Sequence, residues 1–135
     1  MKILTQSHIN LNKMKQIVKT SLWILLGLLF LFAGGEKLWN PVGHAEEFAH
    51  WGYPLWFVYV TGIIEVLGAV CLFIQAGRLY GVLLLSVTMI GASITHLRAG
   101  EMGAFPVPLV LLLGLLTLAW TMKYPKRSDS ESNSS

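Results

Sequence analysis

Four long stretches of the sequence are almost entirely apolar, and shorter polar segments separate them. They cover about 18–39, 55–74, 79–97 and 106–122. A membrane-crossing helix needs about 20 predominantly apolar residues, so each stretch predicts one membrane span. The purely apolar part of the first stretch, 22–33, is too short to cross alone. We therefore expect that helix to continue through Gly34, Gly35, Glu36 and Lys37.

The connections indicate how neighbouring helices run. Residues 75–78 form a very short turn, so the second and third spans must be antiparallel neighbours. In the longest connection, 40–54, Pro41 is expected to end the first helix, and 45–51 predicts one or two amphipathic turns in the membrane interface. Pro106 and Pro108 lie in the first turn of the last helix, where a missing N–H is tolerated.

Polar segments flank the apolar part at both ends. Residues 1–16 are polar and basic, and we expect an arm that is mobile or lies in the interface. No convincing A-x-A cleavage site follows the first apolar stretch, so this stretch is interpreted as a retained span. Residues 125–135 predict a disordered polar tail. The remaining part, 17–124, predicts an all-α, membrane-embedded four-helix bundle.

Composition supports the membrane interpretation. The 135 residues are 54% hydrophobic and 13% charged, with a mean hydropathy of +0.60, whereas soluble domains carry about 25% charged residues. The net charge of +3 is no signal for nucleic acid, because the basic residues lie at segment ends. Cys71 is the one cysteine, which excludes an internal disulfide and a C-x-x-C redox pair.

The basic residues also predict an orientation. If there are four spans, one side of the membrane carries Lys2, Lys13, Lys15, Lys19, Arg78, Lys123, Lys126 and Arg127. The opposite side has Lys37 and Arg98, each with acids nearby. The positive-inside rule places the more basic side in the cytoplasm. Both termini are therefore expected to be cytoplasmic.

A carboxylic acid, Glu65, lies in the middle of the second apolar stretch, YVTGIIEVLGAVCLFI. An ionisable group at the bilayer centre costs roughly 2.5–3.5 kcal/mol on insertion scales, and such groups usually face a bundle interior or a wet cavity. Thr61, Gly68, Ala69 and Leu72 share its helix face, and small residues permit close helix packing. We expect this face to point inward.

The predicted topology brings other polar residues toward Glu65. The first and third spans run outward, so their ends place Glu36, Lys37, His96 and Arg98 near the outer face. Glu65 lies roughly 15 Å below the outer end of its own helix at 1.5 Å per residue. We expect these five residues to form a polar network inside the bundle.

Two interpretations of this network remain open. It binds an amphipathic small molecule or conducts protons, with Glu65 and His96 as titrating groups, or it consists of ion pairs that only fix helix register. The sequence indicates no catalytic residue. His44, Glu46, Glu47 and His50 invite a metal interpretation, but a solvated polar face explains them better. We predict no metal site.

Several motifs carry a family resemblance. They are FAGGEKLWNP at 32–41, FAHWGYP at 48–54, GIIEVLGAVCLFI at 62–74, RLYG at 78–81 and ITH at 94–96. With these motifs, about 22–120 resembles the DoxX family of small bacterial membrane proteins. The resemblance implies a four-helix bundle in a bacterial inner membrane. The family's name comes from a subunit of a thiosulfate:quinone oxidoreductase, other members are linked to redox homeostasis, and similar animal proteins act as receptor-assembly chaperones.

Function is predicted more coarsely. The sequence has no cysteine pair, no haem-like histidine pair facing one site and no nucleotide motif, so an accessory subunit of a redox system fits better than a self-contained enzyme. Its ligand would be small and apolar or amphipathic, such as a quinone, with no bound metal or haem. Expected partners are the lipid bilayer, a membrane or redox protein and a second copy, but no nucleic acid. The alternatives are a non-enzymatic assembly factor or scaffold, and a small proton-coupled carrier that acts as a dimer.

Overall fold

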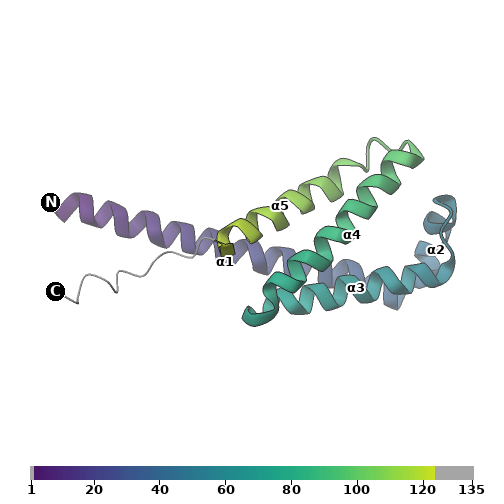
Figure 1. The fold of residues 1–135 in the computed structure, drawn as a ribbon, viewed down its shortest axis with the longest axis horizontal. Coiled ribbons are helices and arrows are strands. Elements are labelled where there is room, and N and C mark those ends of the chain that lie inside the picture. The colour runs from purple at the N-terminus through teal and green to yellow at the C-terminus, as the bar shows by residue number, and fades with distance from the viewer. Residues whose placement is uncertain (1, 124–135) are drawn as a thin grey trace.

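The computed structural model describes residues 2–123, and within this range the chain is helical with short connections (Figure 1). The helices are α1 (Lys2–Trp39), α2 (Pro41–His50), α3 (Leu55–Phe73), a 3-10 turn (Gln75–Gly77), α4 (Arg78–Ala99) and α5 (Pro106–Lys123). No strand occurs among the described residues. The predicted all-α fold is therefore confirmed.

Three helical segments are long and apolar enough to cross a membrane. They are α1, α3 and the stretch 75–99, which joins the 3-10 turn to α4. The apolar part of α5, Pro106–Met122, is shorter, so a fourth crossing stays a prediction. The boundaries predicted for the membrane spans also stay predictions. The tail predicted for 125–135 lies outside the described residues.

The first helix is longer than its predicted span. It continues through Gly34 and Gly35 to Trp39, as its apolar length required, but it already begins at Lys2. No glycine or proline interrupts 2–26, so nothing in the sequence stops the helix at the start of the apolar stretch. The segment predicted as an arm is therefore helical from Lys2 on, and it extends beyond the other helices (Figure 1).

The α2 helix is also longer than the one or two turns expected at 45–51. It begins at Pro41, whose fixed φ suits the first helical position. The side-chain oxygen of Asn40 accepts a hydrogen bond from the Gly43 backbone N–H at 3.2 Å, which caps the helix. A Cβ at Gly43 would lie 2.5 Å from Asn40 Nδ2. Because Gly43 has no side chain, it leaves room for this cap.

The four long helices form two pairs. α1 packs along α3 and α4 packs along α5, while α3 packs along α4 and α1 contacts α5 between the pairs. The pairs lie close together at the turn between α3 and α4 and separate toward α2, which contacts α1 and α3 (Figure 1). The buried apolar core fills the closed end, with residues from four helices that include Leu26, Phe30, Leu72, Leu85 and Leu115.

Glycines set the closest helix contacts. A Cβ at Gly34 of α1 would lie 2.8 Å from the Gly62 carbonyl oxygen of α3, and one at Gly81 of α4 would lie 2.6 Å from the Gly68 carbonyl oxygen. Small residues allow this approach of helix backbones. The predicted inner face of α3 is accordingly buried at Glu65, Gly68, Ala69 and Leu72, and partly buried at Thr61.

Candidate functional site

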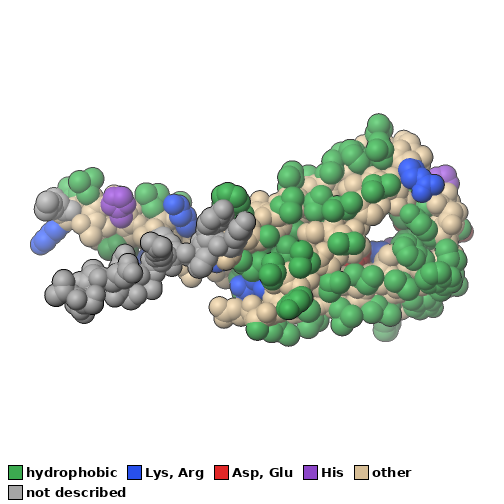
Figure 2. Space-filling model, viewed as in Figure 1, with side chains coloured by type: hydrophobic (Ala, Val, Ile, Leu, Met, Phe, Trp, Pro, Cys, Tyr) green, Lys and Arg blue, Asp and Glu red, His purple; other side chains and the backbone are tan. Residues whose placement is uncertain are grey.

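A cavity of about 790 Å³ separates the two helix pairs at the end that α2 covers. Residues from all five α-helices line it, and most of them are apolar, among them Phe48, Phe57 and Ile64. The space-filling view shows an opening into the molecule between α3 and α4, beside α2 (Figure 2). Small-molecule sites typically measure about 300–1,000 Å³ and are mostly apolar, so the cavity has the size and character of a ligand site.

An ion pair lies on the wall formed by α1 and α3. Lys37 Nζ donates a hydrogen bond to Glu65 Oε2 at 2.9 Å and another to the Ala33 carbonyl oxygen at 3.4 Å. The side chains of Lys37 and Glu65 are 16% and 6% exposed, and both line the cavity. The close contact between Gly34 and Gly62 brings the two helices near enough for this pair to form. An ion pair in an apolar surrounding holds a fixed charge arrangement against the cavity.

A second polar cluster lies at the end of α4. His96 Nδ1 is 2.7 Å from Glu101 Oε2, and the Trp51 indole N–H donates to both carboxylate oxygens of Glu101 at 3.2 Å. The rings of Trp51 and His96 meet edge to face, with centroids 5.1 Å apart. His50 Nε2 is 3.7 Å from Glu101 Oε1. This cluster ties the α2 end to the connection between α4 and α5, and Trp51 and His96 also line the cavity.

The hydrogen bond with His96 is the main cause that lowers the pKa of Glu101, and the hydrogen bond from Trp51 adds to it. The sequence analysis did not place Glu101 or Trp51 in the site. The sequence holds one local signal for this contact, which is Gly100 just after the last turn of α4. A glycine at this position commonly adopts a left-handed conformation that turns the chain back, and the φ of Gly100 is 73°. This turn lets the Glu101 N–H bond the His96 carbonyl oxygen at 2.9 Å, which directs the acid back toward the histidine.

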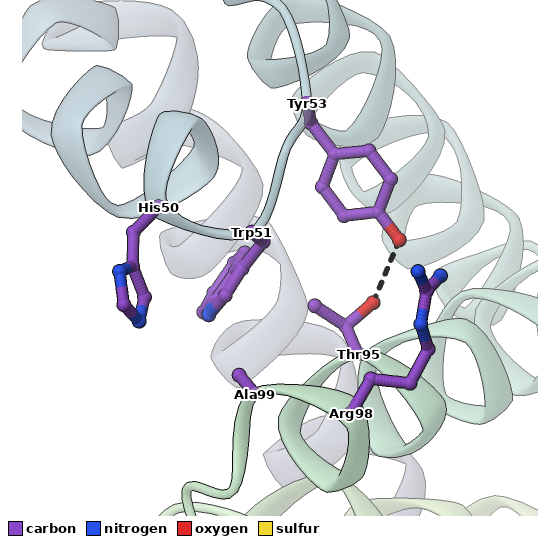
Figure 3. Close-up of a pocket in the computed structure, with 6 residues that line it drawn as sticks. All are labelled: His50, Trp51, Tyr53, Thr95, Arg98 and Ala99. Atoms are coloured by element: carbon purple, nitrogen blue, oxygen red, sulfur yellow. Dashed lines mark hydrogen bonds between the residues drawn. The ribbon is translucent and has the colours of Figure 1, made fainter.

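A smaller cavity of about 210 Å³ lies next to this cluster (Figure 3). On one side of it, Tyr53 and Thr95 share a hydrogen bond of 2.9 Å. The Thr95 hydroxyl donates to the Gly91 carbonyl oxygen, so Tyr53 is the donor to Thr95. Figure 3 shows the Arg98 guanidinium beside this bond, while His50 and Trp51 face the space from the end of α2.

The structure brings three of the five predicted site residues to the larger cavity: Lys37, Glu65 and His96. His96 bonds Glu101 there and not Glu65. Glu36 lies outside, 51% exposed, with its Oε1 4.0 Å from His44 Nε2, and the exposed Arg98 lines the smaller cavity. The predicted network is thus divided into an inner ion pair and an outer cluster. Within residues 2–123 no three His, Cys, Asp or Glu side chains gather to hold a metal.

The fold and the cavity define a small helical integral membrane protein with an internal site that contains charged groups. The chain belongs to the DoxX-like family, which residues 21–119 match, so the resemblance drawn from the motifs is confirmed. A protein of Bacillus subtilis strain 168 named "Putative oxidoreductase CatD" is 35% identical over 113 residues, which cover 82% of this chain and 84% of that protein. "Uncharacterized protein YdgD" of the same organism is 35% identical over 74 residues, 51% of this chain and 65% of that protein. No solved structure matches the chain.

Proposed function

We propose that this protein is a membrane subunit of a redox system and binds a quinone-like molecule in the larger cavity. The observation that carries the proposal is an apolar cavity of about 790 Å³ with the Lys37–Glu65 ion pair on its wall. A scaffold without a ligand would have its interior filled by side chains. The oxidoreductase name of the related CatD protein agrees with a redox role.

The cavity walls fit the two parts of such a molecule. An ammonium group has three N–H donors, and the contacts of Lys37 with Glu65 and Ala33 account for two of them. The third N–H is then available to a carbonyl oxygen of a ligand. Phe48 and Phe57 offer aromatic surface for an apolar ring. A quinone combines such carbonyl oxygens with an apolar ring.

The redox step itself is assigned to a partner. Reducing a quinone to a quinol takes two electrons and two protons, and Cys71 as the one cysteine provides no internal disulfide to supply the electrons. We therefore propose that a membrane redox protein exchanges electrons with the ligand, while this chain binds and orients it. The location in a bacterial inner membrane with cytoplasmic termini is part of the same proposal.

The scaffold alternative has one observation in its favour. Lys37 and Glu65 are already paired at 2.9 Å, so their charges are satisfied without a ligand, and the pair links α1 to α3. Removing one partner of such a buried pair is strongly destabilising in many proteins. If this is the whole purpose of Glu65, its replacement lowers stability and changes nothing else.

A thermal-stability experiment separates the two functions. We would measure the Tm of the wild type, Glu65→Gln and the control Glu36→Gln in detergent, each with and without a short-chain quinone. A hundredfold excess over Kd stabilises a native state by about 2.7 kcal/mol, so we expect the quinone to raise the Tm of the wild type by several degrees. Glu36 lies outside the cavity, so Glu36→Gln should keep this shift. Glu65→Gln should stay folded and lose it.

The opposite outcome is equally clear. If the quinone leaves the wild-type Tm unchanged and Glu65→Gln only melts lower, the ion pair is structural and the scaffold function replaces the ligand function. Glutamine keeps the size of the side chain and an acceptor oxygen for Lys37. The variant therefore tests the carboxylate charge with little change in packing.

A further inference from the structure

The larger cavity has an open edge between α3 and α4. Val87 and Gly91 of α4 line the cavity, and both are exposed, Val87 to 70%. Across the opening, Val60 and Ile64 of α3 line the cavity and are partly buried. A Cβ added at Gly91 would meet nothing within 4 Å. Figure 2 shows an opening between α3 and α4, beside α2.

This edge lies at mid-depth of a membrane span. Gly91 is about 20 Å along α4 from Arg78 and about 12 Å from Ala99, at 1.5 Å per residue. The segment that contains it is one of those long and apolar enough to cross a membrane. The hydrocarbon core of a bilayer is about 30 Å thick. An opening at this depth therefore faces acyl chains and not water.

Polar and apolar groups are separated across the cavity. The Lys37–Glu65 pair occupies the wall of α1 and α3, and His96 lies near the α2 end. The open edge has Val60, Ile64 and Val87, which provide only hydrocarbon surface. A molecule that satisfied both regions would place a polar head at Lys37 and an apolar tail at the edge.

We propose that the ligand enters the cavity from the bilayer between α3 and α4 and keeps an apolar tail in that opening. The ligand class is then a membrane-dissolved amphiphile with a polar head and a hydrocarbon tail, in place of a small molecule that arrives from water. This inference rests on the proposed function, since it describes how the same site is reached and filled.

A second side of the cavity provides the matched control. Between α1 and α5, Phe32 and Val107 also line the cavity and are exposed, to 73% and 61%. A large side chain at Val107 would narrow that side, and one at Gly91 would narrow the α3–α4 edge. Gly91→Phe and Val107→Phe therefore test the two routes with the same added ring.

The experiment uses the full chain in lipid nanodiscs and two benzoquinones with the same head, one without a tail and one with a decyl tail. In the wild type we expect the tailed quinone to raise the Tm more than the tail-less one at equal concentration. Gly91→Phe should lose this extra shift and keep the shift that the tail-less quinone gives. Val107→Phe should behave as the wild type. The Tm of each variant without quinone serves as its baseline. Val87→Phe, which adds a ring at the same edge, replaces Gly91→Phe if that variant does not fold.

Two results would overturn the inference while the proposed function stands. Gly91→Phe could keep the full shift with the tailed quinone, or Val107→Phe could lose it, which would place the tail between α1 and α5. If neither quinone changes the Tm of the wild type, the proposed function fails and this inference fails with it.

Discussion

A carboxylate at the end of the bundle joins residues from three segments. Glu101 in the connection after α4 bonds His96 within α4 and Trp51 just after α2. These hydrogen bonds, with His96 the larger cause, lower the pKa of Glu101 from its ordinary value of about 4.5. The lowered pKa means that the folded protein favours the ionised carboxylate more than the unfolded chain does.

The sign of the pH dependence follows directly. Because the folded pKa of Glu101 is depressed, its stabilising contribution is fully present above the unfolded pKa and is lost as the pH falls through the folded pKa. We expect the Tm of the wild type to exceed that of Glu101→Gln near neutral pH, and this difference to shrink below about pH 4.5. Thermal melts of both proteins from pH 7 to pH 3 measure it. The quantity to compare is the difference in Tm between the two proteins, because it removes the effect of the other carboxylates, which are the same in both. A difference in Tm that stays constant from pH 7 to pH 3 would contradict the prediction.

Single residues differed in how far the sequence could place them. Glu65 could be assigned to the interior because an acid in an apolar helix has few other places to point. Lys37 could be placed at the same end of the bundle because the first helix had to continue that far to cross a membrane. The partner of His96 could not be assigned, because it depends on a left-handed turn at Gly100 and on the position of Trp51. Contacts that depend on connections between helices carry no periodic signal.

At the scale of helices, neighbouring glycines in α1 have opposite surroundings. A Cβ at Gly34 would lie 2.8 Å from the Gly62 carbonyl oxygen and 2.9 Å from Glu65 Cβ, whereas one at Gly35 would meet nothing within 4 Å. We expect Gly34→Ala to lower stability by about 1–3 kcal/mol, because it overpacks the contact of α1 with α3. Gly35→Ala should be neutral or stabilise by about 0.4–1 kcal/mol, since alanine favours the helix.

The two alanine variants control for each other, because the chemical change and the helix are the same. Unfolding of both in detergent, followed by circular dichroism, gives the comparison with the wild type. Equal effects of the two substitutions would show that α1 and α3 do not pack through Gly34. Displacement of α1 by Gly34→Ala should also lengthen the contact between Lys37 and Glu65, which weakens quinone binding if the proposed function is correct.

The long apolar elements were predictable, and their ends were less so. Hydrophobic length predicted the cores of α1, α3, α4 and α5, because each must be apolar to be buried or to face lipid. The start of α1 at Lys2 and the full length of α2 were missed. A polar helix start has no hydrophobic pattern, and the cap of α2 depends on the Asn40 side chain meeting the Gly43 N–H.

For the whole molecule, the cavity is a consequence of how the helix pairs are joined. The short turn between α3 and α4 holds the pairs together at one end, where Gly68 and Gly81 let the helices touch. At the other end α2 and the longer connections allow the pairs to separate, which opens about 790 Å³ between them. The sequence predicted that the polar residues would gather at this end. It could not predict an opening between the pairs, because the angle between helices depends on packing along their whole length.

The arrangement of the helices also gives the last prediction, which concerns topology. If α5 crosses the membrane as α1, α3 and α4 are expected to, both termini and the turn at Gln75 lie in the cytoplasm, and Met102 lies outside, because basic residues gather on the first side. Cysteines introduced one at a time into a Cys71→Ala background, at Ser7, Gln75, Met102 and Ser128, test this with a membrane-impermeant thiol reagent on intact cells. We expect labelling at Met102→Cys alone before lysis and at all four positions afterwards. Labelling of Ser128→Cys together with Met102→Cys would mean that α5 does not cross, and the bundle would then have three spans with its final helix lying against them.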